Sequence, residues 1–166
     1  MPTLEEYRLT LARAELGWLT SAAIRLLGAD AGSVGIPEGI DGLMRLGAMA
    51  SPDGALEFIR IDATDTYGER VVTGGCIVDV SASSLANTAG PDTFMRASEL
   101  HAFLGAPMID PSGARLGMMA VMTHEDRIWS RHDIADLSSC ARLGAHAIAG
   151  HACPDTTTVA RAIARP

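Results

Sequence analysis

The stretch at residues 103–121, Phe-Leu-Gly-Ala-Pro-Met-Ile-Asp-Pro-Ser-Gly-Ala-Arg-Leu-Gly-Met-Met-Ala-Val, decides the fold of this chain. It links two apolar runs, residues 101–109 and 116–123, through an Asp-Pro-Ser-Gly segment whose residue types favour a tight turn. Pro107 fits a strand only at an edge or a bulge, where its missing N–H is tolerated, and Gly117 allows a neighbouring backbone to approach closely. We therefore predict two central antiparallel strands that form a hairpin.

A long helix is predicted at the start of the chain, over residues 3–27, because Thr3 can cap it and Gly28 follows its end. Its apolar residues form two stripes on different faces. The first stripe comprises Tyr7, Leu11, Ala14, Trp18 and Ala22, and the second comprises Leu9, Leu16, Leu19, Ala23 and Leu26. Two apolar faces imply two partners, the body of the domain and a second protein chain. Burial of the whole helix deep in the fold is the alternative.

The last helix is predicted to begin after Ser130, which can cap it, and to end before Pro154. One face carries the apolar residues Ile134, Leu137, Ala141, Ala145 and Ile148. The small residues Ala141, Gly144 and Ala145 allow a second helix to approach closely. We therefore expect a homodimer in which the first and last helices of two chains pack as a four-helix bundle.

Between these helices, short apolar runs and turn residues predict further strands. The predicted strands occupy residues 30–36, 43–50, 55–61 and 76–80, and a short helix is predicted over residues 66–72. The first three strands would begin an antiparallel sheet. Residues 81–100 are the least regular part of the chain, where Ser, Asn, Gly and Pro interrupt what we expect to be two short helices.

The composition predicts one domain with an aliphatic core. Of the 166 residues, 48% are hydrophobic but only 4% are aromatic, and eight methionines are able to fill irregular gaps. Such packing suits a pocket that can change shape. No internal repeat or low-complexity linker divides the chain, so we expect a single domain over residues 1–166, with a core over 3–152 and a tail over 153–166.

Charge and residue usage argue against several classes of protein. The net charge of −7 opposes binding to a phosphate backbone, so we expect no nucleic acid as a partner. All 13 basic residues are arginines, whereas a P-loop and a Schiff-base enzyme both need a lysine. The sequence shows neither a signal peptide nor a run of apolar residues long enough to span a bilayer. We expect a cytoplasmic protein with no membrane partner.

The cysteines predict neither a disulfide framework nor a zinc site. Cys76, Cys140 and Cys153 form an odd set without a Cys-x-x-Cys spacing. We expect buried free thiols, because an unpaired cysteine generally packs as a small apolar residue.

The histidines do not predict a metal site either. His101 and His124 flank the predicted hairpin and could ligate haem iron from a pocket rim, but a surface or hydrogen-bonded histidine is far commoner. His146, His151 and Cys153 do not share one face of a helix. We expect no metal, haem, bilin or other cofactor.

Residues 103–121 resemble the most recognisable part of the GAF family, in which a strand ending in a Pro-hydrophobic pair leads through a glycine turn into a strand beginning Leu-Gly. Residues 127–133, Arg-Ile-Trp-Ser-Arg-His-Asp, are similar to the family's turn into its last helix. Upstream, residues 78–80 and Phe94 fall where family members often carry a Val-x-Asp and an Arg-Phe pattern. The resemblance covers roughly residues 3–150.

The resemblance implies an α+β fold of the GAF/PAS type. Its expected parts are a central antiparallel sheet of five to six strands, the first and last helices on one face, and short helices and loops around a small-molecule pocket on the other. A fold does not fix an activity. Members that bind cyclic nucleotides use a signature with a lysine, which this chain lacks. Members that carry bilin attach it to a cysteine, usually beside a histidine, and those that reduce free methionine sulfoxide need several cysteines around the pocket. Only Cys76 falls in the pocket half of this chain.

The irregular segment and the strands beside it supply the candidate ligand site. They would enclose an apolar cavity with few polar groups, lined by Val78, Val80, Leu85, Phe94, Met95, Leu100, His101 and Phe103. The same residues would equally form an ordinary core beneath a long loop.

Three functions follow from these observations. The first is a non-catalytic regulatory domain that binds a small molecule and signals through helix pairing or a separate effector protein. The second is a homodimeric interaction or scaffold protein whose pocket is vestigial. The third is a thiol-dependent enzyme that uses Cys76, and it lacks a second thiol to resolve the reaction. We expect no enzymatic activity.

Overall fold

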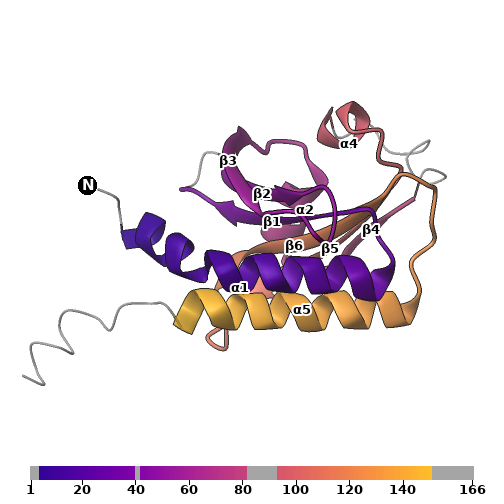
Figure 1. The fold of residues 1–166 in the computed structure, drawn as a ribbon. Coiled ribbons are helices and arrows are strands. Elements are labelled where there is room, and N and C mark those ends of the chain that lie inside the picture. Colours follow the sequence, from indigo (N-terminus) through magenta and orange to yellow (C-terminus); the bar gives the residue numbers. More distant parts are fainter. Residues whose placement is uncertain (1–3, 40–41, 82–92, 151–166) are drawn as a thin grey trace, which may run out of the picture.

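Six strands form one antiparallel sheet in the order β3-β2-β1-β6-β5-β4 (Figure 1). The computed structural model describes residues 4–39, 42–81 and 93–150, and the side chains of residues 4–11, 93 and 94 lie outside that description. The strands are β1 (Ala31–Pro37), β2 (Leu43–Met49), β3 (Glu57–Asp62), β4 (Val78–Val80), β5 (Ala102–Ile109) and β6 (Arg115–Thr123). The helices are α1 (Leu4–Leu27), α2 (Tyr67–Gly74), α4 (Thr93–Ala97) and α5 (Arg131–Gly150). This architecture confirms the predicted fold class.

The predicted hairpin is confirmed as β5 and β6. Asp110 forms its turn by accepting hydrogen bonds from the backbone N–H of Ser112 at 2.8 Å and of Ala114 at 2.9 Å. Pro107 lies past the segment of β5 that pairs with β4, just before a register shift between Met108 and Ile109. Its missing N–H therefore costs no ladder hydrogen bond with β4.

The close approach expected at Gly117 is also present. A Cβ at this position would collide with the carbonyl oxygen of Gly35 on the neighbouring strand β1. Gly117 lies near the start of β6 and pairs with Met108 of β5. Only a residue without a side chain allows β1 and β6 to approach this closely.

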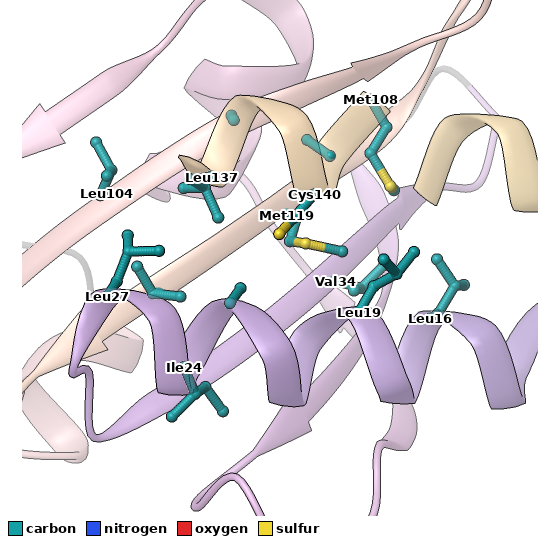
Figure 2. Close-up of a cluster of buried hydrophobic side chains, with 14 of the residues drawn as sticks. Leu16, Leu19, Ile24, Leu27, Val34, Leu104, Met108, Met119, Leu137 and Cys140 are labelled. Atoms are coloured by element: carbon teal, nitrogen blue, oxygen red, sulfur yellow. The ribbon is translucent and has the colours of Figure 1, made fainter. Parts of the chain in front are cut away.

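Helices α1 and α5 lie side by side on one face of the sheet and run in opposite directions (Figure 1). The main hydrophobic core lies between these helices and the sheet, and Figure 2 shows its side chains converging from both helices and from the strands. Within the described residues, no helix combines the length and apolarity that a bilayer crossing requires.

The two stripes of α1 have different surroundings. Leu16, Leu19 and Ala23 of the second stripe are buried in the main core, whereas Trp18 of the first stripe is 69% exposed. Leu26 departs from the rest of the second stripe and is 64% exposed, because Leu27, one position later, takes the place in the core. The N-cap assigned to Thr3 and the side chains of Tyr7, Leu9 and Leu11 lie outside the described residues.

The small residues of α5 face the interior of the chain. Ala141, Gly144 and Ala145 are buried, and a Cβ on Gly144 would lie 2.9 Å from Met108 Sδ and 3.4 Å from Leu16 Cδ2. They allow α5 to approach α1 and the sheet of the same chain. The expectation that they contact a second chain was therefore wrong.

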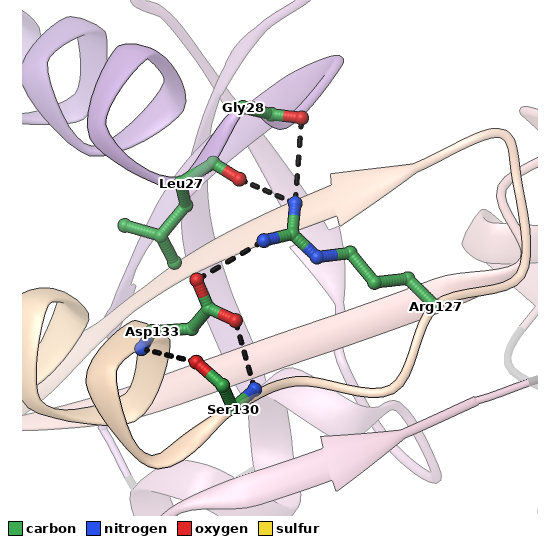
Figure 3. A network of polar contacts seen from close by, with 5 residues as sticks. All are labelled: Leu27, Gly28, Arg127, Ser130 and Asp133. Carbon is green, nitrogen blue, oxygen red and sulfur yellow. Dashed lines mark hydrogen bonds and ion pairs between the residues drawn. The ribbon is translucent and has the colours of Figure 1, made fainter.

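Arg127 and Asp133 join the end of α1 to the start of α5 (Figure 3). The guanidinium of Arg127 donates to the carbonyl oxygen of Leu27, and its Nη2 donates to Asp133 Oδ1 at 3.0 Å. Asp133 also accepts from the backbone N–H of Ser130 at 2.8 Å, while Ser130 Oγ accepts from the N–H of Asp133 at 3.2 Å. This reciprocal pair is a capping box, which confirms Ser130 as the cap of the last helix.

Candidate functional site

An apolar cavity lies on the face of the sheet opposite α1 and α5, beneath α2 and α4. Its volume is about 30 Å³. We call it the methionine cavity and define it by its lining residues, which are Ser33, Met44, Leu46, Ile61, Thr66, Gly68, Met95, Phe103, Met118 and Met122. No charged side chain is among them. The cavity therefore suits an apolar occupant.

Small residues on the central strands leave room for the cavity. Ser33 of β1 pairs with Ala48 of β2 and with Ala120 of β6, so three short side chains lie abreast. Two residues along β1, a Cβ on Gly35 would collide with the Met44 sulfur and lie 2.8 Å from Met118 Cε. The long, flexible side chains of Met44 and Met118 thus extend over the short residues of the central strands.

The methionines divide between the two faces of the sheet. Met44, Met95, Met118 and Met122 belong to the cluster on the cavity side. Met49, Met108 and Met119 belong to the main core beneath the helices. Because an unbranched thioether side chain adopts many conformations at low cost, the four cavity-side methionines form walls that can rearrange.

The two hydroxyls that line the cavity differ in their hydrogen bonding. Thr66 caps α2: its Oγ1 accepts from the N–H of Glu69 at 3.1 Å and donates to the carbonyl oxygen of Ala63 at 2.7 Å. Ser33 is only 2% exposed, and no hydrogen bond to its Oγ is found among the described residues. Ser33 is therefore the polar group that this cavity offers to an occupant.

The structure brings only part of the predicted ligand site together. Met95 and Phe103 line the cavity. Val80 and Leu100 are buried in the same cluster without lining the cavity, and Val78 packs against that cluster from its edge. His101 is exposed and does not line the cavity. The side chain of Phe94 and the whole of Leu85 lie outside the described residues.

Most of the lining residues were missed by the sequence analysis. They come from β1, β2, β3, α2 and β6, and are Ser33, Met44, Leu46, Ile61, Thr66, Gly68, Met118 and Met122. A sequence signal did exist for one of them, since Ser33 is a hydroxyl in the middle of an apolar strand. A buried polar residue of this kind needs a partner.

The thiols lie away from the cavity. Cys76 is exposed and does not line it, so the expectation of a buried thiol was wrong at this position. The reason is local, because Gly75 ends α2 in a left-handed conformation and turns the chain outward before β4. Cys140 is buried in the main core, and this burial raises the pKa of its thiol, with a smaller contribution from Asp136. Cys153 lies outside the described residues.

No cluster of metal-ligating side chains occurs in the part of the chain that the structure describes. His124 Nδ1 lies 3.3 Å from the carbonyl oxygen of Glu99, a contact of the kind that stabilises a loop. His151, which the sequence analysis weighed as a ligand, lies outside this part.

The second region of interest is the exposed surface of the two long helices. Trp18 and Leu26 on α1 are 69% and 64% exposed, and Leu143 on α5 is 53% exposed. We call these three residues the outer helix face. Where exposed apolar side chains form a contiguous patch, the patch usually marks an interaction site.

Comparison with protein families gives a match over most of the chain. The family model described as GAF domain matches residues 16–148, which include the second half of α1, most of α5 and all six strands. Among curated protein sequences, none matches the chain.

Solved structures share the fold at low sequence identity. The GAF domain of a phosphoenolpyruvate-protein phosphotransferase from Coxiella burnetii is 18% identical with a TM-score of 0.65, over 90% of this chain and 84% of that one. The blue-light-absorbing PixJ GAF domain of Thermosynechococcus elongatus is 16% identical with a TM-score of 0.67, over 95% and 93%. A type II free methionine-R-sulfoxide reductase from Thermoplasma acidophilum is 17% identical with a TM-score of 0.65, over 90% and 97%. Such identities establish the fold and leave the ligand open.

Proposed function

Since the chain belongs to the GAF domain family, we propose that it is a non-catalytic regulatory domain. In this proposal a small molecule binds in the methionine cavity, and the binding event reaches α1 and α5 on the opposite face of the sheet. The signal then passes to a second copy of the chain or to a separate effector protein.

The observation that carries the proposal is the methionine cavity itself. It is apolar, it lies over the middle of the sheet, and it contains one buried hydroxyl without a partner among the described residues. Pockets of small-molecule sites are typically apolar with a few well-placed polar groups. A core built only for stability would place an apolar residue at Ser33, because a buried unpartnered hydroxyl is costly.

Strand β1 provides a short path from the cavity to α1. Ser33 faces the cavity, while its neighbour Gly32 lies under α1, where a Cβ would meet Thr20 and Ile24 at 2.7 and 3.0 Å. Any shift of β1 at Ser33 therefore moves the surface on which α1 packs. Close packing transmits such shifts because protein interiors have little free space.

Strand β6 provides the equivalent path to α5. Met118 and Met122 line the cavity, whereas Met119 between them points into the main core. Met119 Cε lies 3.5 Å from the position that a Cβ would take on Gly144 of α5. A ligand that displaces Met118 would thus also change the packing of α5.

The positions of the thiols support a non-catalytic role. Cys76 lies outside the cavity, and Cys140 lies in the core on the other face of the sheet. A thiol reaction in the cavity needs a nucleophile within reach of the bound molecule, and usually a second thiol to resolve the product. Thiol chemistry, which the methionine sulfoxide reductase of Thermoplasma acidophilum suggests by analogy, is therefore not proposed for this chain.

A second candidate function, a homodimeric scaffold with a vestigial pocket, is favoured by the size of the cavity. A volume of about 30 Å³ holds one or two water molecules and no metabolite unless the walls move. In this alternative the outer helix face supplies the function and the cavity is a residual packing defect.

Native mass spectrometry of the purified protein tests the proposal, because it reports bound ligand and subunit number together. We expect one ligand mass per subunit, which is lost in the Leu46→Phe variant that fills the cavity from β2. The matched control is Leu43→Phe, three residues earlier on the same strand and 38% exposed, which should keep the ligand. Retention of the ligand by Leu46→Phe would place the site elsewhere, and a ligand-free wild-type dimer would favour the scaffold.

A further inference from the structure

Hydrogen bonding in the methionine cavity depends on a single side chain. Thr66 already uses its Oγ1 both as donor and as acceptor, in the cap of α2. Ser33 Oγ faces the cavity from β1 with no partner among the described residues. An occupant can therefore make one good side-chain hydrogen bond, either to the Ser33 hydroxyl proton or to its lone pairs.

The absence of charge among the lining residues limits what can enter. Each of the ten residues that define the cavity is uncharged. A carboxylate, phosphate or ammonium group moved from water into such surroundings would lose its hydration without a compensating partner, which is a large penalty. Neutral molecules are therefore the class that the cavity can accept.

Water occupies such a cavity poorly. A well-held buried water makes about three hydrogen bonds, and Ser33 is the one hydroxyl here that is still unpaired. A weakly held water is displaced by an apolar group at little cost, which favours binding. The thioether side chains of Met44, Met118 and Met122 can then move aside to widen the cavity from about 30 Å³.

We propose that the methionine cavity takes a compact, neutral and mostly apolar molecule with one hydroxyl or carbonyl group, which hydrogen-bonds to Ser33 Oγ. This inference rests on the proposed function, since it names the class of ligand for the same site.

Three ring compounds of similar size test the ligand class: toluene, phenol and benzoate. They differ in carrying a methyl, a hydroxyl or a carboxylate group on one ring. Binding is followed by NMR on protein with 13C-labelled methionine methyl groups. We expect phenol to shift the signals of the cavity-side Met44, Met95, Met118 and Met122 most strongly, and that of Met119, on the path to α5, less, while the signal of the core methionine Met49 stays in place as an internal control.

The affinities of the three ring compounds test whether Ser33 hydrogen-bonds the bound molecule. Phenol should bind the wild-type protein about fivefold more tightly than toluene, the effect of one ordinary hydrogen bond. In Ser33→Ala that preference should disappear, with toluene bound at least as well as phenol. Benzoate should not bind. Ser138→Ala, which removes a hydroxyl bonded to Ile134 on α5, should leave the preference for phenol unchanged.

Each opposite result has a defined meaning. Equal affinity for toluene and phenol, or a phenol preference that survives Ser33→Ala, would overturn the assignment of Ser33 and leave binding in the cavity standing. Tight binding of benzoate would overturn the neutral ligand class. If none of the three probes shifts a cavity-side methionine, both this inference and the proposed binding function fail.

Discussion

Arg127 donates a hydrogen bond to the carbonyl oxygen of Leu27, a residue 100 positions earlier in the sequence. Its guanidinium also lies 4.4 Å from the centre of the Trp129 ring and bonds Asp133 at the start of α5. One side chain thereby satisfies the end of α1 and orders the start of α5. The two helices that would carry a signal are thus held together at one end.

Replacing Arg127 with Met should lower the free energy of unfolding by about 2 kcal/mol, because the part-buried carbonyl of Leu27 and the carboxylate of Asp133 both lose a charged donor. Arg142→Met, at an exposed position of α5, is the matched control and should change stability little. Urea unfolding followed by circular dichroism measures both. Equal stability of the two variants would show that the Arg127 contacts contribute nothing net.

Acidification should weaken the ion pair between Arg127 and Asp133. Burial acts to raise the pKa of Asp133, but the hydrogen bonds from Ser130 and the charge of Arg127 outweigh it and hold this pKa below the ordinary value of 3.8. The folded state therefore binds the proton less readily than the unfolded state. This stabilisation is complete above pH 3.8 and is lost as the pH falls through the lower pKa of the folded state.

Asp133→Asn should accordingly be less stable than the wild type at pH 7, by about 1 kcal/mol, with a smaller difference at pH 3. Urea midpoints at the two pH values measure this. A stability difference that is the same at both pH values would mean that the ionised carboxylate contributes nothing specific.

Gly117→Ala should destabilise the fold by about 2 kcal/mol or more, since the new Cβ would collide with the carbonyl oxygen of Gly35 and crowd Met108. Gly150→Ala is the control, because a Cβ at Gly150 meets nothing within 4 Å and alanine favours the helix. Thermal melts compare the two. An unchanged melting temperature for Gly117→Ala would contradict the close approach of β1 and β6.

The outer helix face should hold two chains together. We predict that the wild-type protein is a dimer at micromolar concentration and that the double change Trp18→Glu and Leu26→Glu gives a folded monomer, because both side chains are exposed within one chain. Light scattering after gel filtration measures the mass. Ile59→Glu, at a 57% exposed position of the edge strand β3, should remain dimeric. A monomeric wild-type protein would refute the interface.

The sequence predicted most strands and helices within one or two residues, because their signals are local. The hairpin is the clearest case, since apolar runs on both sides of an Asp-Pro-Ser-Gly turn leave few alternatives. The predicted and observed strand bounds differ mainly just after a glycine. Strand β4, for example, begins at Val78 and not at Cys76. There the sequence shows an apolar run but not where pairing starts.

The candidate site was predicted only in part, for a reason that Met95 and Ser33 illustrate. Met95 belongs to a loop-rich segment and so attracted attention as a pocket residue. Ser33 lies in a strand covered on both faces, as does Met118, and such a strand has no polar-apolar alternation to show which side chains share a face. Ser33 and Met118 line the same cavity because β1 pairs with β6.

The sequence by itself therefore determined the family, the hairpin, the two long helices and the exclusion of lysine-dependent chemistry, because these follow from residue types and their local spacing. Only the tertiary structure decided which stripe of α1 is buried and that α5 uses its small residues within the chain. It also decided that Ser33 meets the methionines of β2 and β6. These outcomes depend on how strands distant in the sequence pair and on which helix covers which face, and local spacing does not encode either.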